Sequence, residues 1–305
     1  LNMFRVVFVN IILISNYVLQ VAMLWFIWSY VTRPSVHKVQ SLYKKFHEEV
    51  FVDGAFDSDR FDSWPDQDKI CEVAFSNFFF MYAILCLWWC TILKDVRVIE
   101  RLFRTVKAIP HTLNPFEMIQ LPDEDQGESM VKVQMLTPLV RGLVYGVIIL
   151  PKLGISILLL LIGTVWLSAT DSYADLILNA VALEFVINID ELLFQAMMPS
   201  SIRDAIDETV FWIPDKIATA KDKEADLTQQ YVRSLAYFLI TVIGVYIFMT
   251  YGQYVPRLGV FPGYDGDIQC PTRMEQQTSW VCSFQPWNDD CFPIGGSSAR
   301  VGHEF

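Results

Sequence analysis

The stretch that decides the fold runs from Leu143 to Ser168 and reads LVYGVIILPKLGISILLLLIGTVWLS. It holds one charged residue, Lys152, and an almost unbroken aliphatic run at 155–162. A helix needs about 20 consecutive, mostly apolar residues to cross the roughly 30 Å hydrocarbon core of a bilayer. This stretch is longer than that, so we expect a transmembrane helix that tilts or projects from the bilayer. Pro151 is expected to kink or loosen it.

Three further stretches of the chain have the same character, at 6–31, 73–93 and 232–251. Trp and Tyr prefer the membrane–water interface, and they gather near the end of the first stretch. One more candidate, the fourth in chain order, lies at 173–198. It is apolar but contains acidic and amide side chains, so it spans, re-enters or lies at the interface. With 53% hydrophobic residues, the chain is predicted to be an all-α integral membrane protein, a bundle of four to five transmembrane helices.

The polar stretches between these candidates complete the expected organisation. In chain order we expect a transmembrane helix (1–32), an extracytoplasmic loop (33–72), a second transmembrane helix (73–93), a cytoplasmic loop with a basic amphipathic helix (94–141), a third transmembrane helix (142–168), a transmembrane or re-entrant helix with a polar stripe (173–198), a cytoplasmic amphipathic segment (199–231), a fifth transmembrane helix (232–251) and an extracytoplasmic Cys-rich tail (252–305).

The six cysteines divide between the two kinds of segment. Cys86 and Cys90 lie inside an apolar stretch and are interpreted as small packing residues. The other four occupy polar segments that five spans would place on one side of the membrane; they are Cys71, Cys270, Cys282 and Cys291. Such a partition is typical of disulfides in an oxidising compartment, although chance clustering would also produce it. We expect two disulfides, and the sequence leaves three pairings open.

The basic residues indicate which side is which. The cysteine-free loops hold more Lys and Arg than the cysteine-bearing segments, by a modest margin, so the positive-inside rule favours the cysteine-free side as cytoplasmic. We therefore expect a multi-pass protein of the plasma membrane or an endomembrane, with a small disulfide-stapled extracytoplasmic module at its C-terminal end. With four spans in place of five, the tail would move to the other side.

A polar stripe marks the fourth candidate helix. Glu184, Asn188, Glu191 and Gln195 follow the spacing i, i+4, i+7, i+11, which places them on one narrow face. Acidic side chains at membrane depth usually face a bundle interior or a wet cavity. The stripe therefore predicts a pore lining, a cation site or a proton path. The alternatives are a polar seam that pairs with another helix and an interfacial helix that never spans.

Lys152 is the expected partner of this stripe. It lies about 24 Å from Ser168 along its helix, whereas Glu184 and Glu191 lie about 20 and 30 Å from Asp171 along theirs. If the two helices are antiparallel neighbours, Lys152 lies between the two carboxylates in depth. The alternative is that the lysine side chain extends to the nearer interface.

A second charged pattern follows the second span. Arg97, Arg101, Arg104 and Lys107 recur every three or four residues among apolar residues. This spacing is typical of a voltage-sensor helix, but a sensor needs acidic neighbouring spans and a break that is missing here. We favour a basic amphipathic helix that lies on the cytoplasmic leaflet and binds anionic lipid.

Other functions lack a sequence signal. The net charge of −11 argues against nucleic acid as a partner. No phosphate loop, His-Glu-x-x-His or Cys-x-x-Cys motif occurs, and the four histidines are far apart, so we expect no enzyme, metal or cofactor. The predicted function is a subunit of an ion channel or transporter assembly, a homo- or hetero-oligomer in the lipid bilayer. The alternative is a non-catalytic structural or accessory subunit of a larger membrane complex.

Overall fold

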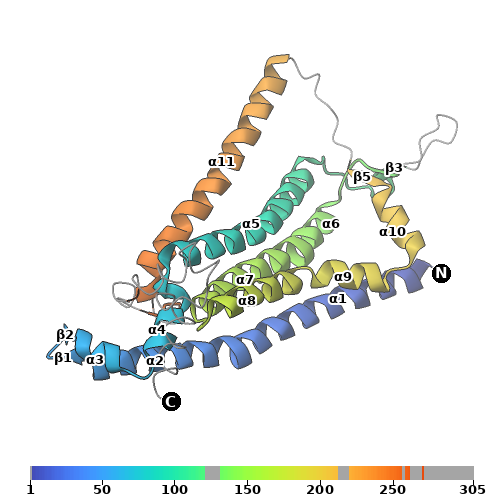
Figure 1. Cartoon of the computed structure of the whole chain (residues 1–305). Helices are drawn as coiled ribbons and strands as arrows, with labels where there is room; N and C mark the ends of the chain where they lie inside the picture. Colours follow the sequence, from blue (N-terminus) through green and yellow to red (C-terminus); the bar gives the residue numbers. More distant parts are fainter. Residues whose placement is uncertain (1, 121–130, 212–219, 256–257, 262–269, 271–305) are drawn as a thin grey trace, which may run out of the picture. The chain divides into compact units, whose positions relative to one another are not determined.

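The computed structural model describes residues 2–120, 131–211, 220–255, 258–261 and 270. Contacts divide the chain, whose helices and strands are labelled in Figure 1, into two compact units. The first unit consists of Leu1–Trp28, Cys86–Gly163 and Val181–Val245, and the second of Ser29–Leu85, Thr164–Ala180 and Tyr246–Phe305. The chain passes from one unit to the other five times, after residues 28, 85, 163, 180 and 245, and each passage lies inside a helix.

Most of the described residues are helical. The long helical stretches are α1 (Asn2–Phe26) with the π-helical η1 (Ile27–Thr32) and α2 (Arg33–Val50); α5 (Phe78–Ala108); α6 (Pro138–Leu143) with the π-helical η5 (Val144–Ile149) and α7 (Leu150–Ser168); and α11 (Ala220–Thr250). Within the described residues, four stretches are long and apolar enough to cross a membrane: Val7–Val50, Phe78–Ala108, Pro138–Ser168 and Leu227–Thr250. The predicted mostly helical class is therefore confirmed, and the length and composition of these four stretches support the membrane-spanning part of the prediction.

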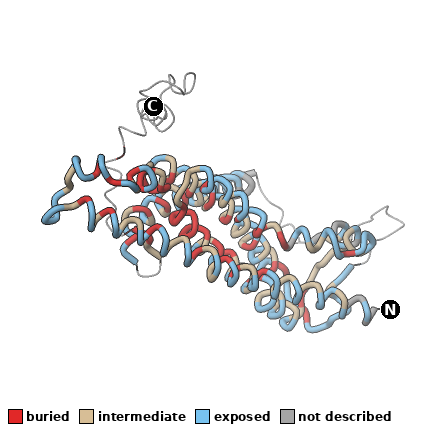
Figure 2. Tube along the Cα trace, turned by 60° about the horizontal axis from the view of Figure 1, so that its bottom comes forward, coloured by how far each residue is buried: buried red, intermediate tan, exposed pale blue. Residues whose placement is uncertain are grey.

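Shorter elements connect these helices. They are β1 (Phe51–Val52), β2 (Ala55–Phe56), α3 (Ser58–Ser63), α4 (Gln67–Glu72), the 3-10 turns η2 (Ala74–Ser76), η3 (Pro115–Glu117) and η6 (Gly252–Tyr254), β3 (Ile119–Gln120), β4 (Val131–Val133), α8 (Tyr173–Ile187), α9 (Ile189–Met197), α10 (Ser200–Asp207) and β5 (Thr209–Phe211). Figure 2 shows that buried residues follow one side of the helices and exposed residues the other. The helices are therefore packed through selected faces.

The fourth candidate span is a broken helix. Asn188 leaves the α-helical conformation, with φ −84° and ψ 5°, and separates α8 from α9. The two pieces have 15 and 9 residues, so neither belongs to the four long apolar stretches. Whether the segment 173–198 crosses the membrane stays a prediction.

Two prolines are preceded by wide π-helical turns. Stretches η1 and η5 each end two residues before a proline, Pro34 and Pro151. Proline has no amide hydrogen and its ring crowds the preceding turn, so the helix widens there instead of breaking. The carbonyl of Val147, which loses its usual donor at Pro151, accepts a hydrogen bond of 2.8 Å from the Tyr17 hydroxyl. The helix through Pro151 is loosened in the way that the sequence predicts.

In the first unit, α5 packs against α7 and α11 through two adjacent tryptophans. Trp88 is 3% exposed, and its indole Nε1 donates to the Leu160 carbonyl at 3.4 Å. A Cβ atom at Gly163 would lie 2.4 Å from the Trp88 ring, and one at Gly244 would lie 2.5 Å from the Trp89 ring. Small residues allow membrane helices to approach closely. The two glycines therefore determine how near α7 and α11 come to α5.

A small sheet closes the same unit. Strand β4 pairs antiparallel with β3 and parallel with β5, which brings segments near residues 119, 132 and 210 together. Beside it, Val106 and Ile109 at the end of α5 pack against Leu136. The Arg141 guanidinium also donates to the Ile109 carbonyl. These contacts fix the start of α6 against the end of α5.

In the second unit, the segment predicted as a polar loop at 33–72 is mostly helical. Helix α2 buries Val39, Phe46 and Val50, whose spacing of seven and four residues places them on one face. Beyond it, β1 and β2 form a hairpin whose turn, Asp53 and Gly54, has two positive φ angles of 51° and 80°. Such angles characterise the tight turn that joins two hairpin strands. The polar residues of this segment therefore cover a packed aromatic cluster.

This cluster surrounds Phe46, which is 0% exposed. Six aromatic rings have centroids within 6.4 Å of its own; they belong to Tyr43, His47, Phe51, Phe56, Phe61 and Trp64. The Trp64 indole also donates to Glu49 at 2.7 Å. The second unit thus has an apolar core of its own, built largely from side chains that follow the first apolar stretch.

The tail returns to this core. Phe261 packs against Tyr43 and Phe75, with ring centroids 5.6 and 5.4 Å apart. The Gln253 side-chain oxygen accepts hydrogen bonds from the amides of Val260 and Phe261 at 2.9 and 3.3 Å. The structure joins Cys71 to Cys270, with Cα atoms 5.5 Å apart. Cys282 and Cys291 lie outside the described residues, so their pairing stays a prediction.

The Cys71–Cys270 pairing can be tested together with the predicted side of the tail. We expect a mass-tagged maleimide to label neither cysteine in denatured, unreduced protein, because both thiols are consumed in the disulfide. Treating intact cells with a membrane-impermeant reductant before denaturation should make both available, since an extracytoplasmic disulfide is accessible from outside. Cys270→Ser serves as the control and should leave Cys71 labelled without reductant. Labelling that appears only when a permeant reductant is used would place the tail on the cytoplasmic side.

Candidate functional site: an acidic helix face and an arginine cleft

The predicted polar stripe lies on an exposed face of α8 and α9. Glu184, Glu191 and Gln195 are exposed, and Asn188 is half-buried at the break between the helices. The Gln195 amide donates to the Glu191 carboxylate at 2.6 Å, and the Asn188 amide donates to the Glu184 backbone carbonyl at 3.0 Å. The four residues thus form two local pairs, one on either side of the break.

Another face of the same helices is buried. Leu183, Val186 and Ile187 are at most 8% exposed, and α9 packs along α1 within the first unit. The neighbours of the carboxylates are exposed apolar residues, Phe185 at 59% and Leu192 at 46%. The acidic stripe therefore lies on a surface that the described residues leave exposed.

Lys152 lies on α7 in the same unit and is half-buried. Its backbone carbonyl accepts a hydrogen bond of 3.0 Å from the Ser156 hydroxyl. The predicted pairing of its ammonium group with Glu184 or Glu191 stays a prediction.

The predicted basic helix is the C-terminal part of α5 and not a separate element. Helix α5 has 31 residues and continues without a break from the apolar stretch through Arg97, Arg101, Arg104 and Lys107. Its length of about 46 Å exceeds the roughly 30 Å core of a bilayer. The sequence predicts a separate basic helix lying flat on the leaflet. The basic residues instead continue the apolar helix along its axis.

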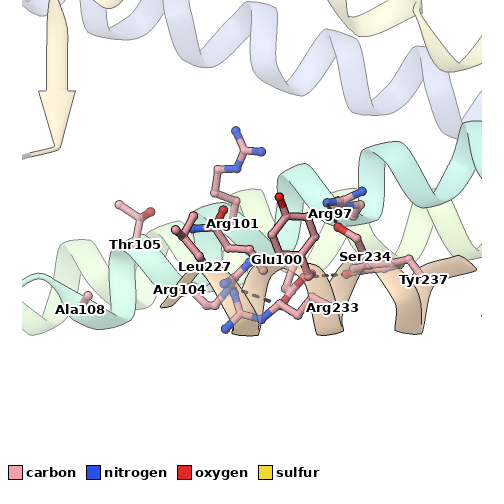
Figure 3. Close-up of a pocket in the computed structure, with 12 residues that line it drawn as sticks. Arg97, Glu100, Arg101, Arg104, Thr105, Ala108, Leu227, Arg233, Ser234 and Tyr237 are labelled. Carbon is pink, nitrogen blue, oxygen red and sulfur yellow. Dashed lines mark hydrogen bonds and ion pairs between the residues drawn. The ribbon is translucent and has the colours of Figure 1, made fainter. Parts of the chain in front are cut away.

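Three of the four basic residues line a cleft between α5 and α11. The two helices run antiparallel, as contacts from Trp89 to Gly244 and from Glu100 to Tyr237 show. The cleft has a volume of about 810 Å³. It is lined by Arg97, Glu100, Arg101, Arg104, Thr105 and Ala108 from α5 and by Leu227, Gln230, Tyr231, Arg233, Ser234 and Tyr237 from α11 (Figure 3). Lys107 is not among these residues.

Glu100 organises this cleft. Its carboxylate accepts a hydrogen bond of 2.6 Å from the Tyr237 hydroxyl and pairs with the Arg104 guanidinium at 3.3 Å. Arg97 donates to the Ser234 hydroxyl at 3.3 Å, and its guanidinium carbon lies 5.2 Å from the centre of the Tyr237 ring. These contacts hold Arg97 and Arg104 in place and join α5 to α11. Dashed lines in Figure 3 mark the hydrogen bonds and ion pairs among them.

The cleft keeps an excess of positive charge. Four arginines face one glutamate, and within the described part of the chain Arg101 and Arg233 make no ion pair or hydrogen bond. A guanidinium group presents donors in a fixed planar fork that matches phosphate and carboxylate oxygens. The arrangement can therefore bind an anion through two arginines that internal contacts do not occupy.

The sequence analysis missed the contribution of α11 to this cleft. Gln230, Ser234 and Tyr237 follow the spacing i, i+4, i+7, so they share one helix face, and Arg233 lies beside them. The sequence shows this polar face at the start of an apolar stretch, so the role of α11 in a polar site could have been predicted. Its pairing with the arginines of α5 depends on the antiparallel packing of two helices that are more than a hundred residues apart.

A second charged cluster lies in the second unit, at a cleft of about 510 Å³. Lys38 pairs with Asp171, and Lys69 pairs with Asp66 at 2.6 Å. The hydrogen bond from Lys69 lowers the pKa of Asp66. Partial burial, and secondarily the charges of nearby aspartates, raises the pKa of Glu72. Two of the lysines here are paired with aspartates, so this cluster is read as a structural contact between α2, α4 and the turn before α8.

Comparison of the chain with protein-family models, with curated protein sequences and with solved structures gave no match, so its function is argued from the residues and their geometry.

Proposed function

We propose that the chain is a subunit of an oligomeric ion channel or transporter in which the acidic face of α8 and α9 lines the conduction path. The observation that carries this proposal is the position of Glu184 and Glu191. Both carboxylates are exposed on a face rich in exposed apolar residues, whereas other residues of α8, among them Leu183 and Val186, are buried.

The energetics favour a wet or subunit-covered environment for this face. A charged side chain at the centre of a membrane helix costs on the order of 3 kcal/mol even on insertion-based scales. Two carboxylates facing lipid would be strongly unfavourable. A neighbouring subunit that presents the same face would enclose both carboxylates around a shared aqueous path. A ring of acidic side chains is also a recurrent selectivity element of cation channels.

The course of the chain supports a crossing by α8 and α9. Four crossings, one for each long apolar stretch, would place residues 33–72 and the tail on opposite sides of the membrane. Five crossings, with α8 and α9 as the additional one, would place the 33–72 segment and the tail on the same side of the membrane. They are also consistent with the contact between Cys71 and Cys270.

The proposal is tested by cation flux into liposomes that contain the purified protein. Replacing both carboxylates, Glu184→Gln and Glu191→Gln, should reduce the flux about tenfold or more, because the amide keeps the size of the side chain but removes the charge that attracts cations. Asp175→Asn, an exposed acidic position in the first turn of the same helix, is the matched control and should change the flux less than twofold.

Two results would contradict the proposal. The first is flux through the wild-type protein that is indifferent to the double substitution. The second is a wild-type protein that is folded and correctly oriented in the liposomes yet passes no ion under any applied gradient.

The second candidate function, a structural subunit of a larger complex, is favoured by one specific observation. Gln195 donates to Glu191, and Asn188 donates to the Glu184 backbone, so part of the stripe is already hydrogen-bonded within its own helices. A seam between helices of different subunits requires such satisfied polar groups. Stoichiometric partner proteins retained in native nanodiscs, together with the absence of flux, would favour this function over conduction.

A further inference from the structure

We infer that the cleft between α5 and α11 binds the phosphorylated headgroup of a polyanionic membrane lipid, with an acyl chain of the same lipid in an adjoining groove. This inference concerns a site separate from the acidic face of α8 and α9, and it stands whether or not the protein conducts ions.

The first step is the depth of the cleft. The apolar part of α5, from Phe78 to Leu93, covers about 24 Å, and the basic residues begin directly after it at Lys94. Helix α11 has the mirrored arrangement, because most of its polar residues come first, up to Ser234, and a mostly apolar run follows from Leu235 onward. Since the two helices are antiparallel, their polar ends coincide. The cleft therefore lies at the level of the headgroups if both helices span.

The second step is the chemistry of the lining. Four arginines and one glutamate give the cleft a formal charge of about +3 at neutral pH. Glu100 is already engaged by Tyr237 and Arg104, so it orders the site without neutralising Arg101 or Arg233. Hydroxyl and amide groups of Thr105, Ser234 and Gln230 add neutral hydrogen-bonding partners. A headgroup with more than one phosphate on a polyhydroxylated ring matches both kinds of group.

The third step separates a lipid from a soluble phosphate. A second cleft, of about 540 Å³, adjoins the first and shares Arg97, Arg101, Ser234 and Tyr237 with it. Its other lining residues include the apolar side chains of Leu93, Val98 and Phe238, and the remaining ones are Cys90, Lys94 and Thr241. An amphipathic ligand would place its phosphates among the arginines and its acyl chain along these apolar side chains. A soluble sugar phosphate would leave the second cleft empty.

The size of the site agrees with such a ligand. Pockets for small molecules usually measure about 300–1,000 Å³, and the arginine cleft falls within this range. The Trp89–Gly244 contact holds α5 and α11 together on the apolar side of the two clefts. The site is therefore bounded by a fixed helix crossing.

The test measures binding of a fluorescent inositol bisphosphate lipid to the full-length protein in nanodiscs of neutral lipid. Arg101→Gln combined with Arg233→Gln should weaken binding about 30-fold, because each cation near an anionic headgroup contributes a factor of roughly five. The matched control is Lys107→Gln, a basic residue on the same helix outside both clefts, and it should change binding less than twofold. Arg101→Lys tests the planar fork separately and should weaken binding while keeping the charge.

The outcomes distinguish the possible sources of binding. Equal weakening by Lys107→Gln and by the double substitution would show a diffuse electrostatic surface and overturn the inference. Soluble inositol trisphosphate that displaces the lipid with comparable affinity would show a site for free phosphate and overturn the assignment to lipid. If the double variant does not fold, Arg101→Gln alone decides, with at least a threefold loss expected. Unchanged binding by folded Arg101→Gln would also overturn the inference.

Discussion

Phe46→Ala is expected to unfold the second unit far more readily than any surface substitution, with a loss of about 3–5 kcal/mol in its free energy of unfolding. The Phe46 ring is fully buried and packs among six aromatic rings, so its removal forfeits the transfer free energy of the ring and leaves a cavity. Amide hydrogen exchange in α2 and α3 measures the effect and should accelerate about 100-fold or more. Phe46→Leu fills most of the space and should restore most of the protection.

The chain supplies its own control for this substitution. Phe116 is 93% exposed, so Phe116→Ala removes the same side chain without creating a cavity. We expect it to change the exchange of α2 and α3 by less than twofold. Comparable exchange in the Phe46→Ala variant and the wild-type protein would mean that the aromatic cluster does not form the core of this unit.

Gly163→Leu is the substitution expected to disturb the first unit most. A Cβ atom at this position would lie 2.4 Å from the ring of Trp88, which is buried and hydrogen-bonded to Leu160, so the ring cannot move aside freely. Overpacking of a filled interface typically costs about 1–3 kcal/mol, and a leucine adds three more carbon atoms beyond the Cβ. Thermal unfolding in detergent should therefore show a clear loss of stability.

Gly154→Leu is the matched control on the same helix. A Cβ atom at Gly154 meets nothing within 4 Å, and leucine has a better helix propensity than glycine. We expect this variant to be as stable as the wild type or slightly more stable. Combining Gly163→Ala with Trp88→Leu should recover part of the loss seen for Gly163→Ala alone, which a double-mutant cycle measures. Equal effects of leucine at the two glycines would rule out close packing of α7 against Trp88.

The membrane class of the protein follows from local sequence. The aliphatic run around Leu143–Ser168 and the stretches like it predict apolar helices, and all four of the stretches outside 173–198 are recovered as long helical segments. Hydropathy predicts these apolar helices because the free energy of transferring a side chain out of water depends mainly on that side chain. The loosening near Pro151 follows for the same reason, since proline acts on its own turn.

What covers each helix face was decided by residues far apart in the chain. The 33–72 segment looked like a polar loop because its aromatic residues are interspersed with charged ones. Its core around Phe46 appears only when α2, the β1–β2 hairpin and α3 pack together, and the distant Phe261 packs against Tyr43 beside it. The sequence left three disulfide pairings open, and the tertiary structure selected Cys71 with Cys270, which are 199 residues apart.

The two candidate sites show the same division. The polar stripe of Glu184 to Gln195 is visible in the sequence because helical periodicity is local, but its exposure depends on which face of α8 packs inward. The arginines of α5 are equally visible, but Arg233 joins them only through the antiparallel packing of α11. Sequence periodicity determined which residues share a face, and tertiary packing decided what each face meets, because burial is a property of pairs of surfaces and not of one segment.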